Sequence, residues 1–306
     1  MIRLPLSRSV RLLGACLASL GCLLASCEKP STSPGGAQTA PGSGTASAPA
    51  PPSPAGAAAT PAVPASSPEV AIRELTISTA ASTRDVLEPL AAEFSRERAV
   101  KVKVNAGPSS GLATQILQGA PADLFLSANR DWANRVDKEG HAQARADFLT
   151  NALVLVVPKG NRAEVHAPKD LLSDKVQRVA LAGETVPAGQ YADQALKKLE
   201  LFDSLAESKK IVRGQDVRTT LSHVDRGEAE AGIVYSTDLA AAPNVEEVFR
   251  FDPSAHDEIV YVLVLLKGGA AKPDAKAFFE FLQSPAAAPA FEKAGFQRLN
   301  REPQPN

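Results

Sequence analysis

Short apolar runs and stretches with helical periodicity alternate through residues 71–306. Strand-like runs predict strands at 74–78, 100–105, 123–127, 152–157, 178–181, 231–235 and 259–266. A helix is predicted after Ser82, where one face carries Val86, Leu87, Leu90, Ala91 and Phe94. A second is predicted after Pro187, with a face of Tyr191, Ala192, Ala195, Leu196 and Leu199. Strands that alternate with helices predict an α/β fold with parallel-type sheets flanked by helices.

Most of four predicted helix starts carry small or neutral residues after a predicted strand. The four are the capping-box pattern S82-T-R-D85, the turn P108-S-S-G111, the segment V186-P-A-G189 and the N-cap pattern D216-V-R218. A helix start presents unpaired N–H groups and the positive end of the helix dipole. In an α/β sheet such starts gather at the carboxyl ends of the strands. Several of them in one cleft would bind a fully ionised oxyanion without Lys or Arg.

The first 27 residues have the form of a bacterial lipoprotein signal peptide. Arg3, Arg8 and Arg11 precede an apolar stretch at 12–24, which is too short for a comfortable membrane span. The sequence L24-A-S-C27 then matches a lipobox, in which Cys27 becomes the lipidated first residue. The alternative is an ordinary secretory signal with an incidental cysteine. The lipobox interpretation places the protein in the cell envelope, on the periplasmic side, anchored to a membrane by lipid.

Residues 28–70 predict a disordered Pro/Ala/Ser linker. The segment is almost free of charge, and Val63 is its only large apolar side chain before Val70. It therefore cannot bury enough surface to offset the entropy lost on ordering. As a flexible tether it would reach roughly 35–40 Å.

Charge and cysteine content exclude several classes of function. Without the three arginines of the signal peptide, the 33 basic residues fall to 30 against 34 acidic ones. A mildly acidic chain without a basic stripe is a poor candidate for binding nucleic acid. Cys16 and Cys22 lie inside the signal peptide, so the mature chain offers no disulfide, no thiol catalysis and no zinc spacing.

Longer motifs in the same order resemble the periplasmic molybdate-binding proteins of ABC uptake systems. The resemblance covers essentially residues 73–299, and its most specific parts are G119-A-P-A-D-L-F-L-S-A128, V186-P-A-G-Q-Y-A192 and G232-I-V-Y-S-T-D238. It implies a two-lobed periplasmic binding protein of type II with a hinge. We expect residues 71–156 with 257–306 to form one lobe and residues 157–256 the other, with the hinge near Val157 and Asp252.

In that family two serines, two backbone N–H groups and a tyrosine hydroxyl hold the anion. Transferred to the matching positions, the ligands are Ser82, Ser109, Ala188, Val217 and Tyr235. Ser110 could exchange roles with Ser109, because Pro108 and Gly111 flank the pair where the family pattern differs. The resemblance further implies a monomer that delivers molybdate, and tungstate with it, to the permease and ATPase subunits of an ABC transporter. No cofactor is expected, and molybdenum enters only as the bound anion.

The chemistry of the anion agrees with these residues. Molybdate is fully deprotonated at neutral pH and only accepts hydrogen bonds, so a site made of donors satisfies it. Phosphate keeps a proton that would face another donor, at a cost of about 1–3 kcal/mol. Sulfate has no such proton and must be excluded by size, so a receptor for sulfate or another small oxyanion is the main alternative.

A hydrolase is the second alternative, with Ser82 or Ser109 as its nucleophile. It would need a base beside the serine. His141, His166, His223 and His256 all lie outside the motifs, so we expect no enzyme. A lipid-anchored scaffold protein is the third alternative, and it would explain the linker but not the motifs.

Overall fold

The computed structural model describes residues 73–299. The predicted signal peptide, its lipidated Cys27 and the linker at 28–70 therefore lie outside the described residues. No helix within 73–299 combines the length and the apolar character needed to cross a membrane.

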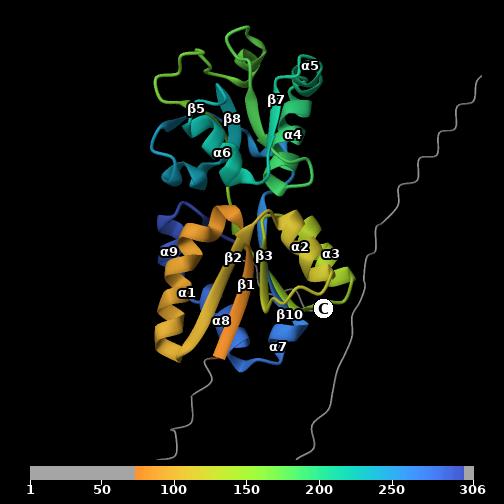
Figure 1. Ribbon diagram of the computed structural model, residues 1–306, viewed down its shortest axis with the longest axis vertical. Helices are drawn as coiled ribbons and strands as arrows, with labels where there is room; N and C mark the ends of the chain where they lie inside the picture. The colour runs from red at the N-terminus through yellow and green to blue at the C-terminus, as the bar shows by residue number, and fades with distance from the viewer. Residues whose placement is uncertain (1–72, 300–306) are drawn as a thin grey trace, which may run out of the picture. The chain divides into compact units, whose positions relative to one another are not determined.

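The first sheet has six strands in the order β11-β4-β10-β3-β1-β2 (Figure 1). Its strands are β1 (Arg73–Ala80), β2 (Val100–Gly107), β3 (Leu124–Ser127), β4 (Ala142–Thr150), β10 (Val260–Leu266) and β11 (Gln297–Arg298). The strands β1, β2 and β3 pair in parallel, whereas β10 runs antiparallel to β3 and β4. The chain adds α1 (Arg84–Arg98), α2 (Ser109–Leu117), α3 (Arg130–Lys138), α7 (Lys267–Ala270), α8 (Pro273–Gln283) and α9 (Ala288–Lys293). We call this sheet with these helices the first lobe.

The second sheet has five strands in the order β7-β6-β8-β5-β9. They are β5 (Leu153–Pro158), β6 (Val179–Ala182), β7 (Ile211–Gly214), β8 (Ala231–Tyr235) and β9 (Val245–Arg250). Here β6 pairs in parallel with β7 and β8, and β5 runs antiparallel to β8 and β9. With α4 (Pro187–Lys198), α5 (Phe202–Glu207) and α6 (Val217–Asp225), this sheet forms the second lobe. Both sheets are therefore mixed, and the strands that end at the site are their parallel parts.

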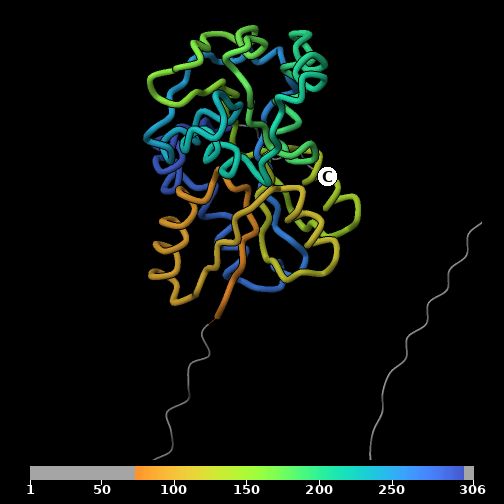
Figure 2. Tube along the Cα trace, turned by 45° about the horizontal axis from the view of Figure 1, so that its top comes forward, coloured from red at the N-terminus to blue at the C-terminus, as the bar shows by residue number. Residues whose placement is uncertain are grey.

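The chain passes twice between the two sheets, and Figure 2 follows it from yellow into green and back into blue. The first crossing is residues 151–152, between β4 and β5, and the second is residues 251–259, between β9 and β10. The predicted boundary after residue 156 divides β5, although β5 pairs along its length with β8 and β9 of the second sheet. The sheet pairing thus places the first crossing about five residues earlier than the sequence pattern suggested.

Alternation along the strands explains how the first sheet is covered on both faces. Leu124 and Leu126 point into the same core cluster as Phe94 of α1 and Phe278 of α8. Phe125, between them, joins the opposite cluster with residues of α2 and α3. Successive side chains of a strand point to opposite faces, so a continuous apolar run is the pattern of a strand buried on both sides.

The helix faces follow the predictions closely, with two corrections. The five residues predicted for the buried face of α1 are its buried residues. In α4 the predicted face is buried up to Leu196, but Leu199 is 42% exposed because the helix has ended at Lys198. The predicted capping box at Ser82 is wrong: Ser82 lies in a 3₁₀ turn, Ala81–Thr83, and neither this turn nor α1 has a side-chain cap.

Candidate anion-binding site

The carboxyl ends of the parallel strands in the two lobes meet around one small cavity. The empty space between the lining atoms is about 220 Å³, which includes space open to solvent. First-lobe residues line it from the ends of β1, β2 and β3, and second-lobe residues from the ends of β6, β7 and β8. Its lining includes all five predicted ligands: Ser82, Ser109, Ala188, Val217 and Tyr235. Each of the five is at most 4% exposed.

The two serines enter from the first lobe, each with one hydrogen bond to its own lobe. Ser109 opens α2, and its Oγ accepts a hydrogen bond from the Ala128 N–H at 3.0 Å. Ser82 Oγ lies 2.8 Å from the Tyr261 hydroxyl. A serine hydroxyl has one proton and two acceptor lone pairs. The proton of Ser109 therefore remains available to a ligand in the cavity.

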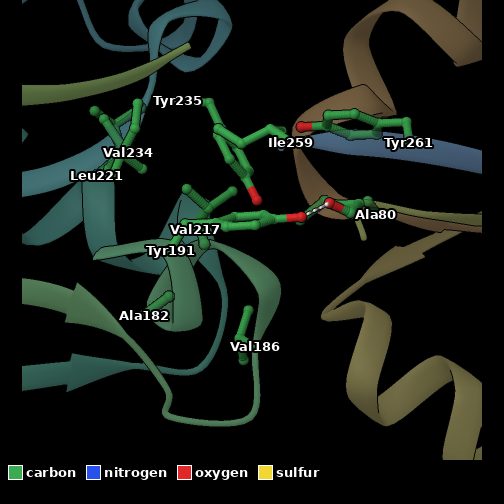
Figure 3. Close-up of a cluster of buried hydrophobic side chains, with 14 of the residues drawn as sticks. Ala80, Ala182, Val186, Tyr191, Val217, Leu221, Val234, Tyr235, Ile259 and Tyr261 are labelled. Carbon is green, nitrogen blue, oxygen red and sulfur yellow. Dashed lines mark hydrogen bonds between the residues drawn. The ribbon is translucent and has the colours of Figure 1, made fainter. Parts of the chain in front are cut away.

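Tyr235 ends β8 and is 1% exposed, and its hydroxyl has no hydrogen-bond partner within the described residues. In Figure 3 its hydroxyl ends beside the ring of Tyr191, and the ring centroids of Tyr191 and Tyr261 lie 6.5 and 5.9 Å from that of Tyr235. Burial raises the pKa of the Tyr235 hydroxyl well above its ordinary value, and nearby Tyr261, Tyr191 and Asp238 raise it further. The phenol therefore keeps its proton and is a donor without an acceptor. Such a buried group costs about 1–3 kcal/mol, and an anion in the cavity would remove that cost.

Two helix starts of the second lobe provide the backbone donors. Pro187 is the first residue of α4, as predicted, which leaves the Ala188 N–H in the first turn. Asp216 caps α6, as predicted: its carboxylate accepts the Thr219 N–H at 2.8 Å, which leaves the N–H of Val217 free of that cap. First-turn N–H groups have no partner inside their own helix. Both therefore offer a donor at the positive end of a helix dipole.

Gly189 explains why the motif V186-P-A-G189 has a glycine at its fourth position. A Cβ at Gly189 would collide with the backbone of Gly183 and Ala182. The first turn of α4 thus lies directly on the chain that leaves β6, and this close approach helps to place the Ala188 N–H at the cavity.

No Lys or Arg is among the residues that line the cavity. Arg218, which follows Val217, is engaged by carboxylates of both lobes. Its Nη2 lies 2.7 Å from Asp85 of α1, and its Nε lies 2.9 Å from Asp238, although these two atoms are not aligned for a hydrogen bond. Burial raises the pKa of Asp238 to about 7, while the positive charge of Arg218 lowers it. Positive potential at the cavity thus comes from neutral donors and helix ends.

The remaining sequence candidates lie outside the cavity. Ser110 is buried beside Ser109 but does not line the cavity. None of the four histidines lines it either, and His223 is bonded to Glu228 at 2.7 Å. Within residues 73–299 no group of three or more His, Cys, Asp and Glu side chains could hold a metal ion.

The sequence did not predict the roles of Tyr261 and Asn151. Tyr261 contacts Ser82 directly, and Asn151 contacts Tyr261. Tyr261 is 179 residues from Ser82 in sequence, in a strand whose seven residues are all buried. The apolar residues on either side of Tyr261 in the sequence indicate only a buried strand and give no sign of a polar role. Asn151 is one of the two residues that join β4 to β5.

The family comparison agrees with this geometry. The model for bacterial extracellular solute-binding proteins matches residues 75–297. The chain belongs to this family. It is therefore a solute-binding protein and not an enzyme, and its fold is the two-lobed type II fold of periplasmic binding proteins.

Proteins similar to this chain include two molybdate-binding proteins and a substrate-binding lipoprotein of an ABC transporter. The molybdate-binding protein ModA of Escherichia coli is 37% identical over 235 residues, which cover 73% of this chain and 88% of ModA. YvgL of Bacillus subtilis, whose name describes an ABC transporter substrate-binding lipoprotein, is 38% identical over 226 residues, covering 72% and 85%. The structure of the periplasmic molybdate-binding protein of Azotobacter vinelandii is 26% identical with a TM-score of 0.66, covering 74% of this chain and all of that one.

Proposed function

We propose that this solute-binding protein captures molybdate, and tungstate as well, between its two lobes. The ligands are the hydroxyls of Ser82, Ser109 and Tyr235 and the backbone N–H groups of Ala188 and Val217. The observation that carries the proposal is the buried Tyr235 hydroxyl, a protonated donor without an acceptor beside a small cavity lined by further donors. The ModA relatives support molybdate as the ion.

Donors alone favour an oxyanion that carries no proton. Among the described residues that line the cavity, Asp216 is the only carboxylate, and its Oδ1 accepts from both the N–H and the hydroxyl of Thr219. A protonated oxyanion would leave a hydrogen facing donors, at a cost of about 1–3 kcal/mol. The site discriminates against phosphate in this way, while sulfate, which is unprotonated and smaller than molybdate, has to be excluded by size.

The cellular setting is part of the same proposal. Cys27 carries a lipid on the periplasmic side of the envelope, and residues 28–70 tether the binding lobes to it. The protein works as a monomer and delivers its anion to the permease and ATPase subunits of an ABC transporter. The lipoprotein relative YvgL supports the anchor. Mass spectrometry of the purified envelope protein should find a diacylglycerol on Cys27, and an unmodified Cys27 would contradict the anchor.

Calorimetric titration of the purified protein tests the ligand. We expect one molybdate per chain with a sub-micromolar dissociation constant, competition by tungstate, and far weaker binding of sulfate and phosphate. Heat with sulfate and none with molybdate would favour the sulfate alternative. No heat with any of the four anions would contradict an oxyanion receptor.

A further inference from the structure

The two serines of the cavity share one requirement. A hydroxyl can donate or accept, so a serine makes a donor-only site only if another group already donates to its oxygen. For Ser109 that group is the Ala128 N–H, which can only donate. For Ser82 the partner is the Tyr261 hydroxyl, for which either direction is chemically possible.

Asn151 decides the direction of the Ser82–Tyr261 hydrogen bond. Its Oδ1 accepts the backbone N–H of Ala152 at 2.9 Å, and because an N–H can only donate, this contact fixes which end of the amide is oxygen. The Nδ2 must then face the other way, toward Tyr261 at 3.3 Å and Thr237 at 2.8 Å. Ser236 donates to the same Oδ1 at 3.1 Å, which agrees with this orientation.

The Tyr261 hydroxyl oxygen therefore accepts a hydrogen bond from the Asn151 amide, and its own proton needs another acceptor. The Tyr261 hydroxyl is fully buried, and Ser82 Oγ and Asn151 are its hydrogen-bond partners within residues 73–299. Burial raises the pKa of Tyr261, so the proton is retained. With the Asn151 amide donating, the arrangement that uses every proton has Tyr261 donating to Ser82, whose own proton then points to the cavity.

We propose that Asn151 and Tyr261 are positioning residues that force Ser82 to donate, and that they thereby set the preference for unprotonated oxyanions. The inference rests on the proposed function and names the residues that enforce its selectivity. The chain of hydrogen bonds runs from Asn151 through Tyr261 to Ser82 and does the work that the Ala128 N–H does for Ser109. Asn151 lies at the first crossing between the sheets, so the same amide also contacts Thr237 of the second lobe.

A double-mutant cycle tests whether Tyr261 acts through Ser82. Tyr261→Phe should weaken molybdate binding roughly three- to tenfold, because the Ser82 hydroxyl is no longer held as a donor. In a Ser82→Ala background the same change should cause no loss. An equal loss in both backgrounds would overturn the proposal and leave Tyr261 as a packing residue.

The proton preference is measured with two anions of similar size, selenate and hydrogenarsenate, of which only the second carries a proton near pH 8. Each competes against molybdate, and the readout is the ratio of their inhibition constants. Tyr261→Phe should lower the preference for selenate at least threefold, since a freed Ser82 can accept the arsenate proton. Tyr191→Phe is the matched control: Tyr191 is also a buried phenol, but it contacts backbone carbonyls and not a serine of the cavity. An unchanged ratio in Tyr261→Phe, or an equal fall in the control, would overturn the proposal.

Loss of function and loss of folding must be distinguished from the predicted effect of Tyr261→Phe. If the unsubstituted protein does not bind molybdate, the proposed function is wrong, and the failure does not come from the hydrogen bonds between Asn151, Tyr261 and Ser82. If Tyr261→Phe does not fold, as judged by thermal unfolding, Asn151→Asp replaces it in the cycle. The new carboxylate keeps the Ala152 contact but attracts the Tyr261 proton away from Ser82. It should therefore weaken binding more with Ser82 present than with Ser82→Ala, and equal losses would overturn the proposal.

Discussion

The two lobes supply the same kind of hydrogen-bond donor by different means. The first lobe offers hydroxyls, Ser82 and Ser109, whose protons can rotate and which each need a neighbouring donor to hold them in place. The second lobe offers mainly backbone N–H groups, at Ala188 and Val217, whose direction is fixed by α4 and α6. Selectivity against protonated anions therefore has two origins. In the second lobe it follows from backbone N–H groups, which can only donate, and in the first lobe it depends on the side chains that orient the serine hydroxyls.

Removing a fixed donor of the second lobe should have the largest effect. Val217→Pro deletes the backbone N–H at the first residue of α6, where proline fits a helix start and follows the extended Asp216. The lost bond is worth about 1.5–3 kcal/mol with a charged ligand, and the proline Cδ takes the place of the hydrogen that would face the anion. We expect molybdate affinity to fall about a hundredfold or more by calorimetry.

Val217→Ala is the matched control, because it keeps the N–H and removes only side-chain atoms. It should bind within about threefold of the unsubstituted protein. If the alanine and proline variants bind equally well, the N–H of Val217 is not a ligand and the comparison between the lobes loses its basis.

Tyr235→Phe should have the next largest effect, since it removes the one second-lobe donor that is a side chain. We expect affinity to fall by about 1–3 kcal/mol, roughly ten- to hundredfold. The thermal stability of the free protein should not fall, because the hydroxyl has no partner there. Unchanged affinity would remove Tyr235 from the site.

A smaller effect is expected from the ion pair that joins the lobes. Arg218 of the second lobe contacts Asp85 of the first at 2.7 Å, but the Asp85 side chain is 62% exposed. Such pairs contribute about 0.2–1 kcal/mol, so Asp85→Ala should weaken binding at most about fivefold, and less at high salt. Glu88→Ala, an exposed carboxylate of the same helix, should change nothing. A tenfold or greater loss would give this pair a larger role in closure.

The pH dependence should be the smallest effect. An ionised Tyr235 would lose its proton as a donor and repel the anion, so affinity would fall as pH rises through its pKa. Burial raises that pKa well above 10, and Asp238, with a pKa of about 7, is already ionised at pH 8. Molybdate affinity should therefore be constant from pH 8 to 10. A decline with its midpoint near pH 10, the ordinary pKa of a phenol, would mean that Tyr235 titrates as an exposed phenol.

Strands buried on both faces could be predicted from sequence, and so could the half-exposed β2, but β4, β7 and β9 could not. The apolar runs behind β5 and β10 are long and continuous, but β9 reads V245-E-E-V-F-R250 and lies at the edge of its sheet. The edge strand β7 is also only partly buried, and β4 is half-buried along most of its length. Half-exposed strands tolerate charge, so their apolar signal is weak.

The site divides in the same way. Its helix starts are local patterns, and the Asp216 cap formed as the sequence predicted. The predicted capping box at Ser82 did not form, because the Ser82 hydroxyl is hydrogen-bonded to the Tyr261 hydroxyl instead. That contact spans 179 residues, and no local pattern contains it. Sequence therefore predicts which groups can donate, while tertiary contacts decide in which direction a hydroxyl does so.

The most direct test of the account is a crystal structure of the molybdate complex with anomalous data at the molybdenum absorption edge. We predict one molybdenum peak, enclosed between the lobes. Its oxygens should lie within hydrogen-bond distance of Ser82, Ser109, Ala188, Val217 and Tyr235. A peak elsewhere would contradict it, for example in the larger cleft lined by Asn129, Glu184 and Lys197.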